Sequence, residues 1–185
     1  ALVVARGAKL FANGTPTRPI VFTSHLDFGI GEGVPYGLMN KDTRGQWGGL
    51  LMCGAAPDNL PPGSEDAWIE GLPQSDLSAF GGDNPDDSSG SVSYVSIMHG
   101  GAVIGADNEI NGLTLAGVGR GTTLHHIEIY ANLDDGIEWF GGTCNMKYAV
   151  VAYCGDDSFD VDYGWNGAVQ FGLSIMSELP NNGDS

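Results

Sequence analysis

The chain has 185 residues and carries 7 basic and 23 acidic side chains, for a formal net charge of −16. This length suffices for one domain with a sizeable core, and we expect a single domain over residues 1–185. The charge argues against nucleic acid and anionic membranes as partners, because both need clusters of Lys and Arg, and it favours metal cations. No apolar run approaches the roughly 20 residues that cross a bilayer, so no transmembrane segment is predicted.

Short apolar stretches in the first half of the chain are separated by long polar segments. Insertions 24–46 and 54–91 are rich in Gly, Pro, Asp and Ser. In a repetitive fold such insertions form loops on one face, often the binding face. The alternative is a loop without a function, because lengthening a loop costs little free energy. Short strands are expected at residues 1–5, at Ile20 and Phe22, at Leu50 and Met52, and at Val95 and Ile97.

The second half of the chain contains an internal repeat. Residues 133–138 and 155–160 match at an offset of 22 residues, which brings Asp134 over Asp156. Residues 107–111 form an earlier copy at an offset of 27 residues, which brings Asn108 over Asp135. Apolar strand pairs precede the copies and are assigned to one repeating column: Ile20/Phe22, Leu50/Met52, Val95/Ile97, Ile127/Ile129, Ala149/Val151 and Phe171/Leu173.

A 22-residue period of short β-rich segments with Gly between them fits one coil of a parallel β-helix. Each coil buries little alone, and stacking the coils buries a continuous core. Alternate side chains of a strand point inward, which places Ile127 and Ile129 inside and His126 and Glu128 outside. The sequence therefore predicts an all-β, parallel β-helical solenoid of about six coils with two long loop insertions. A β-sandwich is the alternative, but its hairpin-linked strands would not give this in-register match.

Five motifs run through the chain: GTPTRPIVFTS (14–24), WGGL (47–50), NEINGLTLAGVGRGT (108–122), DDGIEWFGGT (134–143) and GDDSFDVDYGW (155–165). Together they resemble those of a group of secreted bacterial β-helix proteins, mostly uncharacterised proteins and lipoproteins. The resemblance covers nearly the whole chain. It implies a right-handed parallel β-helix of the pectate-lyase-like type and an extracellular or cell-surface location, but no particular activity.

Stacking the repeats gathers acidic and amide side chains into columns. At a spacing of ~4.8 Å between coils, neighbouring carboxylates would repel by roughly 1–4 kcal/mol per pair. Ca²⁺ would relieve this repulsion, because its ligands are carboxylate, amide and carbonyl oxygens. Screening by solvent or protonation of one carboxyl are the alternatives. The predicted metal ligands are Asn108, Asp135 and Asp157 in one column, Asn111, Glu138 and Asp160 in a second, Asp134 and Asp156 in a third, and Asp162 near them.

An enzyme of the same fold is a rival hypothesis. Gly155-Asp156-Asp157 resembles the G-D-D segment of polygalacturonase-type glycosidases, and paired carboxylates are the usual groups of glycoside hydrolysis. The other motifs of those enzymes are absent, and His99-Gly100-Gly101 matches their G-H-G only loosely. A pectate-lyase mechanism would need a basic residue beside Ca²⁺, for which only Arg120 and Lys147 lie near the right part of the chain. No catalytic residue is therefore predicted.

Aromatic residues follow the acidic segments. Exposed in a row, Trp139, Tyr163 and Trp165 would form a face for stacking on a polysaccharide. Ordinary packing under a turn is the alternative interpretation. These three residues are the predicted ligand-binding set.

The cysteines and the chain ends complete the prediction. Cys144 and Cys154 straddle a predicted strand, so they should lie too far apart to bridge each other; with Cys53 they are expected to be buried small residues or partners of groups outside the chain. No amphipathic helix caps either terminus, and uncapped strand edges favour pairing. The chain is thus either continued by further sequence or stacks on other copies.

Taken together, the sequence predicts an extracellular structural or adhesive β-helix, stabilised by Ca²⁺ and able to stack end to end in a homo-oligomer at the cell surface or in a filament. The alternative is a carbohydrate-active enzyme, either a polysaccharide lyase or a glycosidase, or a carbohydrate-binding module of the same fold.

Overall fold

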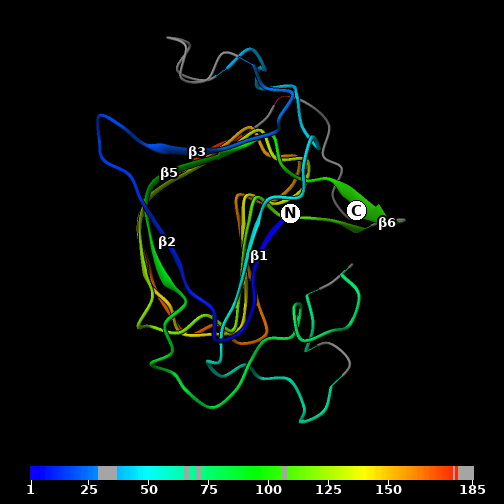
Figure 1. The fold of residues 1–185 in the computed structure, drawn as a ribbon, viewed down its shortest axis with the longest axis vertical. Coiled ribbons are helices and arrows are strands. Elements are labelled where there is room, and N and C mark those ends of the chain that lie inside the picture. The colour runs from blue at the N-terminus through cyan, green and yellow to red at the C-terminus, as the bar shows by residue number, and fades with distance from the viewer. Residues whose placement is uncertain (29–36, 65–66, 70–71, 106–107, 177, 179–185) are drawn as a thin grey trace.

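Two parallel sheets run through the structure. The computed structural model describes residues 1–28, 37–64, 67–69, 72–105, 108–176 and 178. They form a right-handed parallel β-helix, as predicted, and its coils lie over one another in Figure 1. In spatial order the first sheet consists of β1 (Leu2–Val4), β4 (Leu50–Cys53), β8 (Leu113–Ala116), β10 (Ile137–Phe140) and β12 (Phe159–Asp162).

The second sheet contributes one long strand to most coils. In the first coil, two short strands pair with the two halves of the next long strand. A short antiparallel hairpin projects from the connection between the second and third coils. The second sheet consists of β2 (Leu10–Asn13), β3 (Ile20–Phe22), β5 (Gly90–Met98), β9 (Thr123–Tyr130), β11 (Met146–Ala152) and β13 (Val169–Ile175). The hairpin is a separate two-stranded sheet of β6 (Val103–Gly105) and β7 (Asn108–Glu109).

The pairing of strands confirms the 22-residue repeat in the second half of the chain. Ala149 lies opposite Ile127, and Phe159 lies opposite Ile137. The prediction for the last strand is wrong by one residue, because Gly172, not Phe171, lies opposite Ala149. The reason is that the connection from β12 to β13 is one residue longer than the connection from β10 to β11.

A second register prediction is also wrong. Leu50 and Met52 belong to β4 of the first sheet, where they pair with Leu113 and Leu115. They are therefore not members of the column that contains Val95 and Ile97. Without them the described chain has five coils rather than about six.

Each long strand of the second sheet bends at a residue with a positive φ. These residues are Tyr94, His126, Tyr148 and Phe171, with φ of 51°, 53°, 59° and 65°. This left-handed conformation costs roughly 1–2 kcal/mol for a residue with a Cβ. Their rings stack with centroids 4.3, 4.4 and 4.9 Å apart in this order, and each contact contributes about 0.5–1.5 kcal/mol. This stack, the aromatic ladder, offsets part of the strain at the bends.

Apolar side chains fill the space between the sheets and also cover the outside of the first sheet. Ile127, Ile129 and Trp139 are almost completely buried in the inner core. The connection from β4 to β5, residues 54–89, contributes Ile69 and Phe80 to a second core on the outer face. This insertion therefore shields strands β4, β8 and β10, whose residues are buried on both faces.

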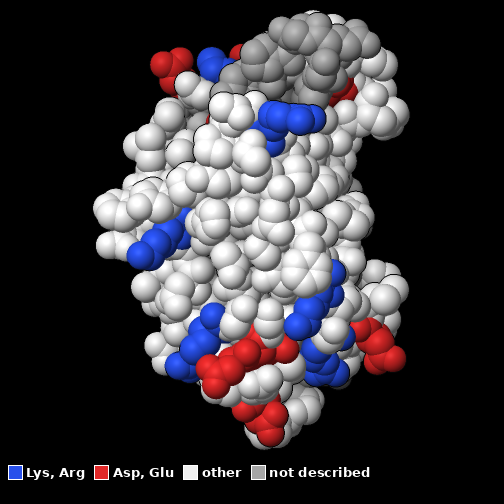
Figure 2. All heavy atoms as spheres, turned by 60° about the vertical axis from the view of Figure 1, so that its left-hand side comes forward, with Lys and Arg blue, Asp and Glu red and all other residues white. Residues whose placement is uncertain are grey.

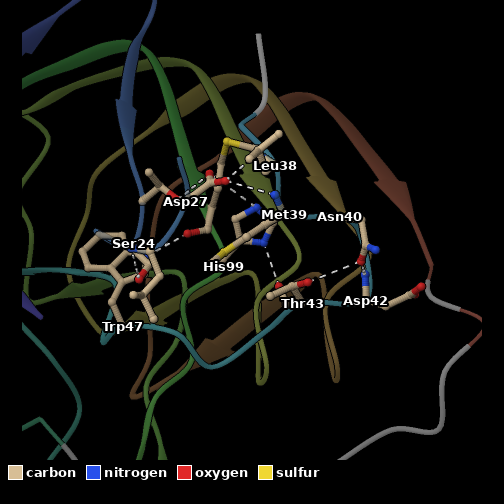
Figure 3. A network of polar contacts seen from close by, with 12 residues as sticks. Ser24, Asp27, Leu38, Met39, Asn40, Asp42, Thr43, Trp47 and His99 are labelled. Atoms are coloured by element: carbon tan, nitrogen blue, oxygen red, sulfur yellow. Dashed lines mark hydrogen bonds and ion pairs between the residues drawn. The ribbon is translucent and has the colours of Figure 1, made fainter. Parts of the chain in front are cut away.

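A buried polar network fastens the connection from β3 to β4 against the end of β5 (Figure 3). Asp27 Oδ1 accepts hydrogen bonds from the backbone N–H groups of Leu38 and Met39, each at 3.0 Å. His99 Nε2 lies 3.9 Å from Asp27 Oδ2, and His99 Nδ1 lies 2.7 Å from the carbonyl oxygen of Thr43. His99 is completely buried, so it anchors a loop and does not line an open site.

The three cysteines are free and buried, which agrees with the prediction of small core residues. Burial raises the pKa of Cys53 to about 11 and the pKa of Cys144 and of Cys154 to about 12. Protonated thiols of this kind pack as small apolar groups. No helix in the described part of the chain is long and apolar enough to cross a membrane.

Candidate functional site

An acidic cleft of about 390 Å³ opens on the outer face of the first sheet, beside β8, β10 and β12. No Lys, Arg or His occurs among the described residues that line it. By contrast, acidic side chains are sparse across the middle of the face in Figure 2, although the chain has a net charge of −16. The lining residues are Ile69, Glu109, Ile110, Asn111, Thr114, Asp134, Asp135, Glu138, Phe140, Asp156, Asp157, Asp160 and Asp162.

Strand pairing brings the predicted carboxylates of the last coils together. Glu138 lies opposite Asp160, as predicted, and Asp135 Oδ1 accepts a hydrogen bond from the backbone N–H of Asp157 at 2.9 Å. Carboxylate oxygens of Asp135, Glu138 and Asp160 all lie within 4.8 Å of one another. The same holds for Asp134, Asp135 and Asp156, so Asp135 is shared by two triads.

The amide positions of the earlier coil were predicted in the wrong register. Glu138 lies opposite Thr114, so the offset between these coils is 24 residues and Asn111 falls in the column of Asp135. Asn111 nevertheless contacts Glu138, because its Nδ2 donates to Oε2. Asn108 lies in the β6–β7 hairpin, outside the columns.

Residues missed at the sequence level also line the cleft. Thr114, Glu109 and Ile69 come from a strand, the hairpin and the 54–89 insertion. A sequence signal existed for Thr114, because Asn-Gly-Leu-Thr-Leu at 111–115 matches Asp-Gly-Ile-Glu-Trp at 135–139. No periodic pattern marks the other two residues, since they enter from irregular segments.

Burial and crowding raise the pKa of the two central carboxyls. Removal from water, followed by the nearby charge of Asp134, raises the pKa of Asp135 to about 8. Removal from water, followed by the charges of Asp135 and Asp160, raises the pKa of Glu138 to about 9. The pKa of Asp162 is also raised, first by burial and then by Asp160. Without a cation, the centre of the cleft therefore holds its protons at neutral pH.

Two neutral side-chain oxygens of the same cleft are buried. Asn111 is 7% exposed and Thr114 is 1% exposed. Neither Asn111 Oδ1 nor Thr114 Oγ1 has a hydrogen-bond partner among the described residues. A buried polar atom left unpaired costs about 1–3 kcal/mol. A ligand in the cleft that accepts lone pairs from oxygen would remove this cost.

The prediction of an exposed aromatic row is wrong. Trp139 is completely buried, because it alternates with the outward-facing Glu138 along β10. Trp165 is half-buried against Trp139, with ring centroids 4.9 Å apart, and Tyr163 packs on Phe140 at 5.4 Å. The alternative interpretation of packing under a turn accounts for all three residues.

The basic residues considered for catalysis lie elsewhere. Arg120 lines a separate small pocket and pairs with Asp86 at 3.3 Å, and Lys147 lies on β11 of the second sheet. The cleft therefore supplies carboxyl, amide and hydroxyl oxygens, but no basic side chain among its described residues. Such a set of groups can bind a hard cation or donate protons.

Comparison with known proteins agrees with the observed architecture. A family model described as a pectate-lyase like beta helix domain matches residues 1–184. No curated protein and no solved structure matches the chain. A match over nearly the entire length establishes the fold, while the chemistry has to be argued from the cleft itself. The chain belongs to the family of pectate-lyase-like β-helix domains.

Proposed function

We propose that the acidic cleft binds Ca²⁺ and that the chain is a cation-stabilised structural or adhesive β-helix module that works outside the cell. One observation carries the proposal. Two buried carboxyls, Asp135 and Glu138, share a cleft with buried oxygens of Asn111 and Thr114. Within the described part of the chain, these two oxygens have no hydrogen-bond partner and no basic side chain lines the cleft.

The spacing of the oxygens suits a calcium ion. Ca²⁺ binds oxygen ligands at about 2.3–2.6 Å, so ligands on opposite sides of the ion lie about 5 Å apart. The carboxylate oxygens in each triad lie within 4.8 Å of one another. All the candidate ligands are oxygens, which favours a hard cation over zinc or copper.

Ca²⁺ binding would be coupled to the release of protons. Metal ligands must be deprotonated, whereas the pKa of Asp135 is about 8 and the pKa of Glu138 is about 9. At pH 7 the ion therefore displaces up to about two protons. Its affinity increases as the pH rises from 7 to 9.

Titration calorimetry with calcium chloride tests this site directly. In two buffers of different ionisation enthalpy, the wild-type chain should bind Ca²⁺ with proton release, and Ca²⁺ should raise its melting temperature. Asp135→Asn with Glu138→Gln should abolish both effects. Asp83→Asn, which removes an exposed carboxylate outside the cleft, should leave both unchanged. If the folded wild-type chain did not bind Ca²⁺, the calcium site proposed here would be wrong.

A glycosidase or polysaccharide lyase is the second candidate, and the raised pKa values favour it. A carboxyl with a pKa near the working pH is suited to general acid catalysis. Incubation with a panel of neutral and acidic polysaccharides separates the two candidates. A turnover that Glu138→Gln eliminates while folding is retained would replace the structural proposal by the enzymatic one.

A further inference from the structure

A second groove lies on the outer face of the second sheet, away from the acidic cleft of the first sheet. Its volume of about 350 Å³ is within the range of small-molecule sites. Its lining combines the aromatic ladder with the next outward-facing positions of β5, β9 and β11. Pro16 and Pro19 join it from the connection between β2 and β3, which projects at the upper left in Figure 1. Figure 2 brings this side forward and shows few charged side chains across its middle.

The ladder contributes an apolar wall to this groove. His126 is stacked between Tyr94 and Tyr148, and Tyr148 is stacked between His126 and Phe171. Both faces of these two rings are therefore occupied, so they present only their edges to a ligand. Stacking of a sugar on a ring, or of a cation over it, requires a free ring face. The middle of the ladder is thus suited to apolar contact and not to polysaccharide stacking.

One carboxylate stands among the apolar side chains of the groove. Glu128 is the only Asp, Glu, Lys or Arg among the described residues that line it. It is half-buried in β9, opposite Ser96 of β5 and Val150 of β11, and Ser96 Oγ donates to its Oε2 at 2.6 Å. Beside apolar side chains a carboxylate attracts a cation more strongly than in water, because the effective dielectric constant is lower. The net charge of −16 adds to this attraction and disfavours anionic ligands.

We propose that this groove binds a small organic amine, whose ammonium group pairs with Glu128 and whose apolar body packs against Tyr148 and Val150. Complementarity of charge carries the choice of ligand. A neutral apolar compound would leave the carboxylate without a counter-ion. Ca²⁺ would find one carboxylate among the described lining residues, whereas it takes about 6–8 oxygen ligands. An ammonium group on an apolar body satisfies both parts of the groove, and the site does not depend on the calcium site.

A matched series of ligands tests the proposal. Phenylbutylamine, phenylbutanol and phenylbutyrate share one apolar body and differ in charge. In NMR titrations at pH 8 in EDTA, the amine should shift the ring signals of Tyr148 and the methyl signals of Val150. It should bind at least about tenfold more tightly than the alcohol, and the carboxylate should bind most weakly. Glu128→Gln, which keeps an acceptor for Ser96, should reduce the affinity for the amine to that for the alcohol. Asp83→Asn, which removes an exposed carboxylate outside the groove, should change neither affinity.

A second variant fills the groove from within the chain. Val150→Lys places an ammonium group on the strand beside Glu128 and should abolish binding of the amine. Circular dichroism identifies a variant that fails to fold, and in that case Glu128→Gln decides alone. An amine that binds wild type no more tightly than the alcohol does overturns the proposal, and so does equal binding of the amine by Glu128→Gln. Signal shifts centred on Glu138 and Asp160 overturn it as well, because they would place the amine in the acidic cleft.

Discussion

Glu138→Gln should make the chain more stable in the absence of a cation, although it removes a charged group from the candidate site. The pKa of Glu138 is about 9 in the folded chain, against 4.5 for a free side chain. Between these two values the folded chain binds a proton that the unfolded chain releases. Stability from this proton is fully present below pH 4.5 and is lost as the pH rises toward 9. Gln resembles the protonated acid in shape and is not affected by pH.

The size of the effect follows from the pKa difference. Each pH unit in the window changes the stability of the wild-type chain relative to the variant by up to about 1.4 kcal/mol. Glu138 is 7% exposed, so screening by solvent reduces this value only in part. The variant should therefore gain on the order of 2–4 kcal/mol over the wild type between pH 5 and pH 8.

Urea unfolding followed by tryptophan fluorescence measures this difference, since Trp139 and Trp165 lie in and against the inner core. The series runs from pH 5 to pH 9 in EDTA and is repeated with Ca²⁺. In EDTA the stability of the two chains should diverge with pH, and Ca²⁺ should stabilise the wild type but not the variant. If the free energies of unfolding of the two chains changed in parallel with pH in EDTA, Glu138 would not be a buried, protonated carboxyl. Equal stabilisation of both chains by Ca²⁺ would place the ion away from Glu138.

Two further predictions concern the scaffold. Tyr148→Ala should lower the free energy of unfolding by about 1–3 kcal/mol, because Tyr148 stacks on His126 and Phe171. Tyr148→Gly should be about 1 kcal/mol more stable than Tyr148→Ala in urea unfolding, since φ is 59°; the opposite order would show that the bend is not strained. Asp27→Ala removes the acceptor for the N–H groups of Leu38 and Met39 and should cost about 1–3 kcal/mol. Limited proteolysis should then cut the connection from β3 to β4 faster while the β-helix stays intact, and unchanged cleavage would argue against an anchoring role.

The acidic cleft was partly visible in the sequence. The repeat of Asp-Asp before each strand predicted the pairing of Glu138 with Asp160, because both coils have 22 residues and no insertion intervenes. The earlier coil was misaligned, since the β6–β7 hairpin lengthens the connection before β8 and the acidic residues there suggested a copy at the wrong offset. Matching Gly112 to Gly136 would have given the correct register, which their backbone hydrogen bonds show.

The alternation of inward and outward side chains along a strand predicted burial correctly where both faces of the strand were considered. It placed Ile127 inside correctly, and applied to β10 it also places Trp139 inside when Glu138 is outside. The exposed aromatic row failed because it relied on composition and ignored this alternation. Burial on the outer face of the first sheet had no such signal, since the residues that cover it come from the irregular segment 54–89.

The sequence by itself determined the class of fold, the 22-residue coil, the inward apolar positions and the concentration of negative charge in the later coils. The inward positions follow from the alternation of side chains along each strand, which does not depend on the lengths of the connections. The 22-residue coil was evident because no insertion intervenes between the two copies at 133–138 and 155–160. Only the tertiary structure decided which sheet each early strand joins, which side chains close the acidic cleft, and how far burial raises the pKa of Asp135 and Glu138. Those properties depend on insertions of irregular length and on removal of the carboxyls from water. Neither of these produces a periodic pattern in the amino-acid sequence.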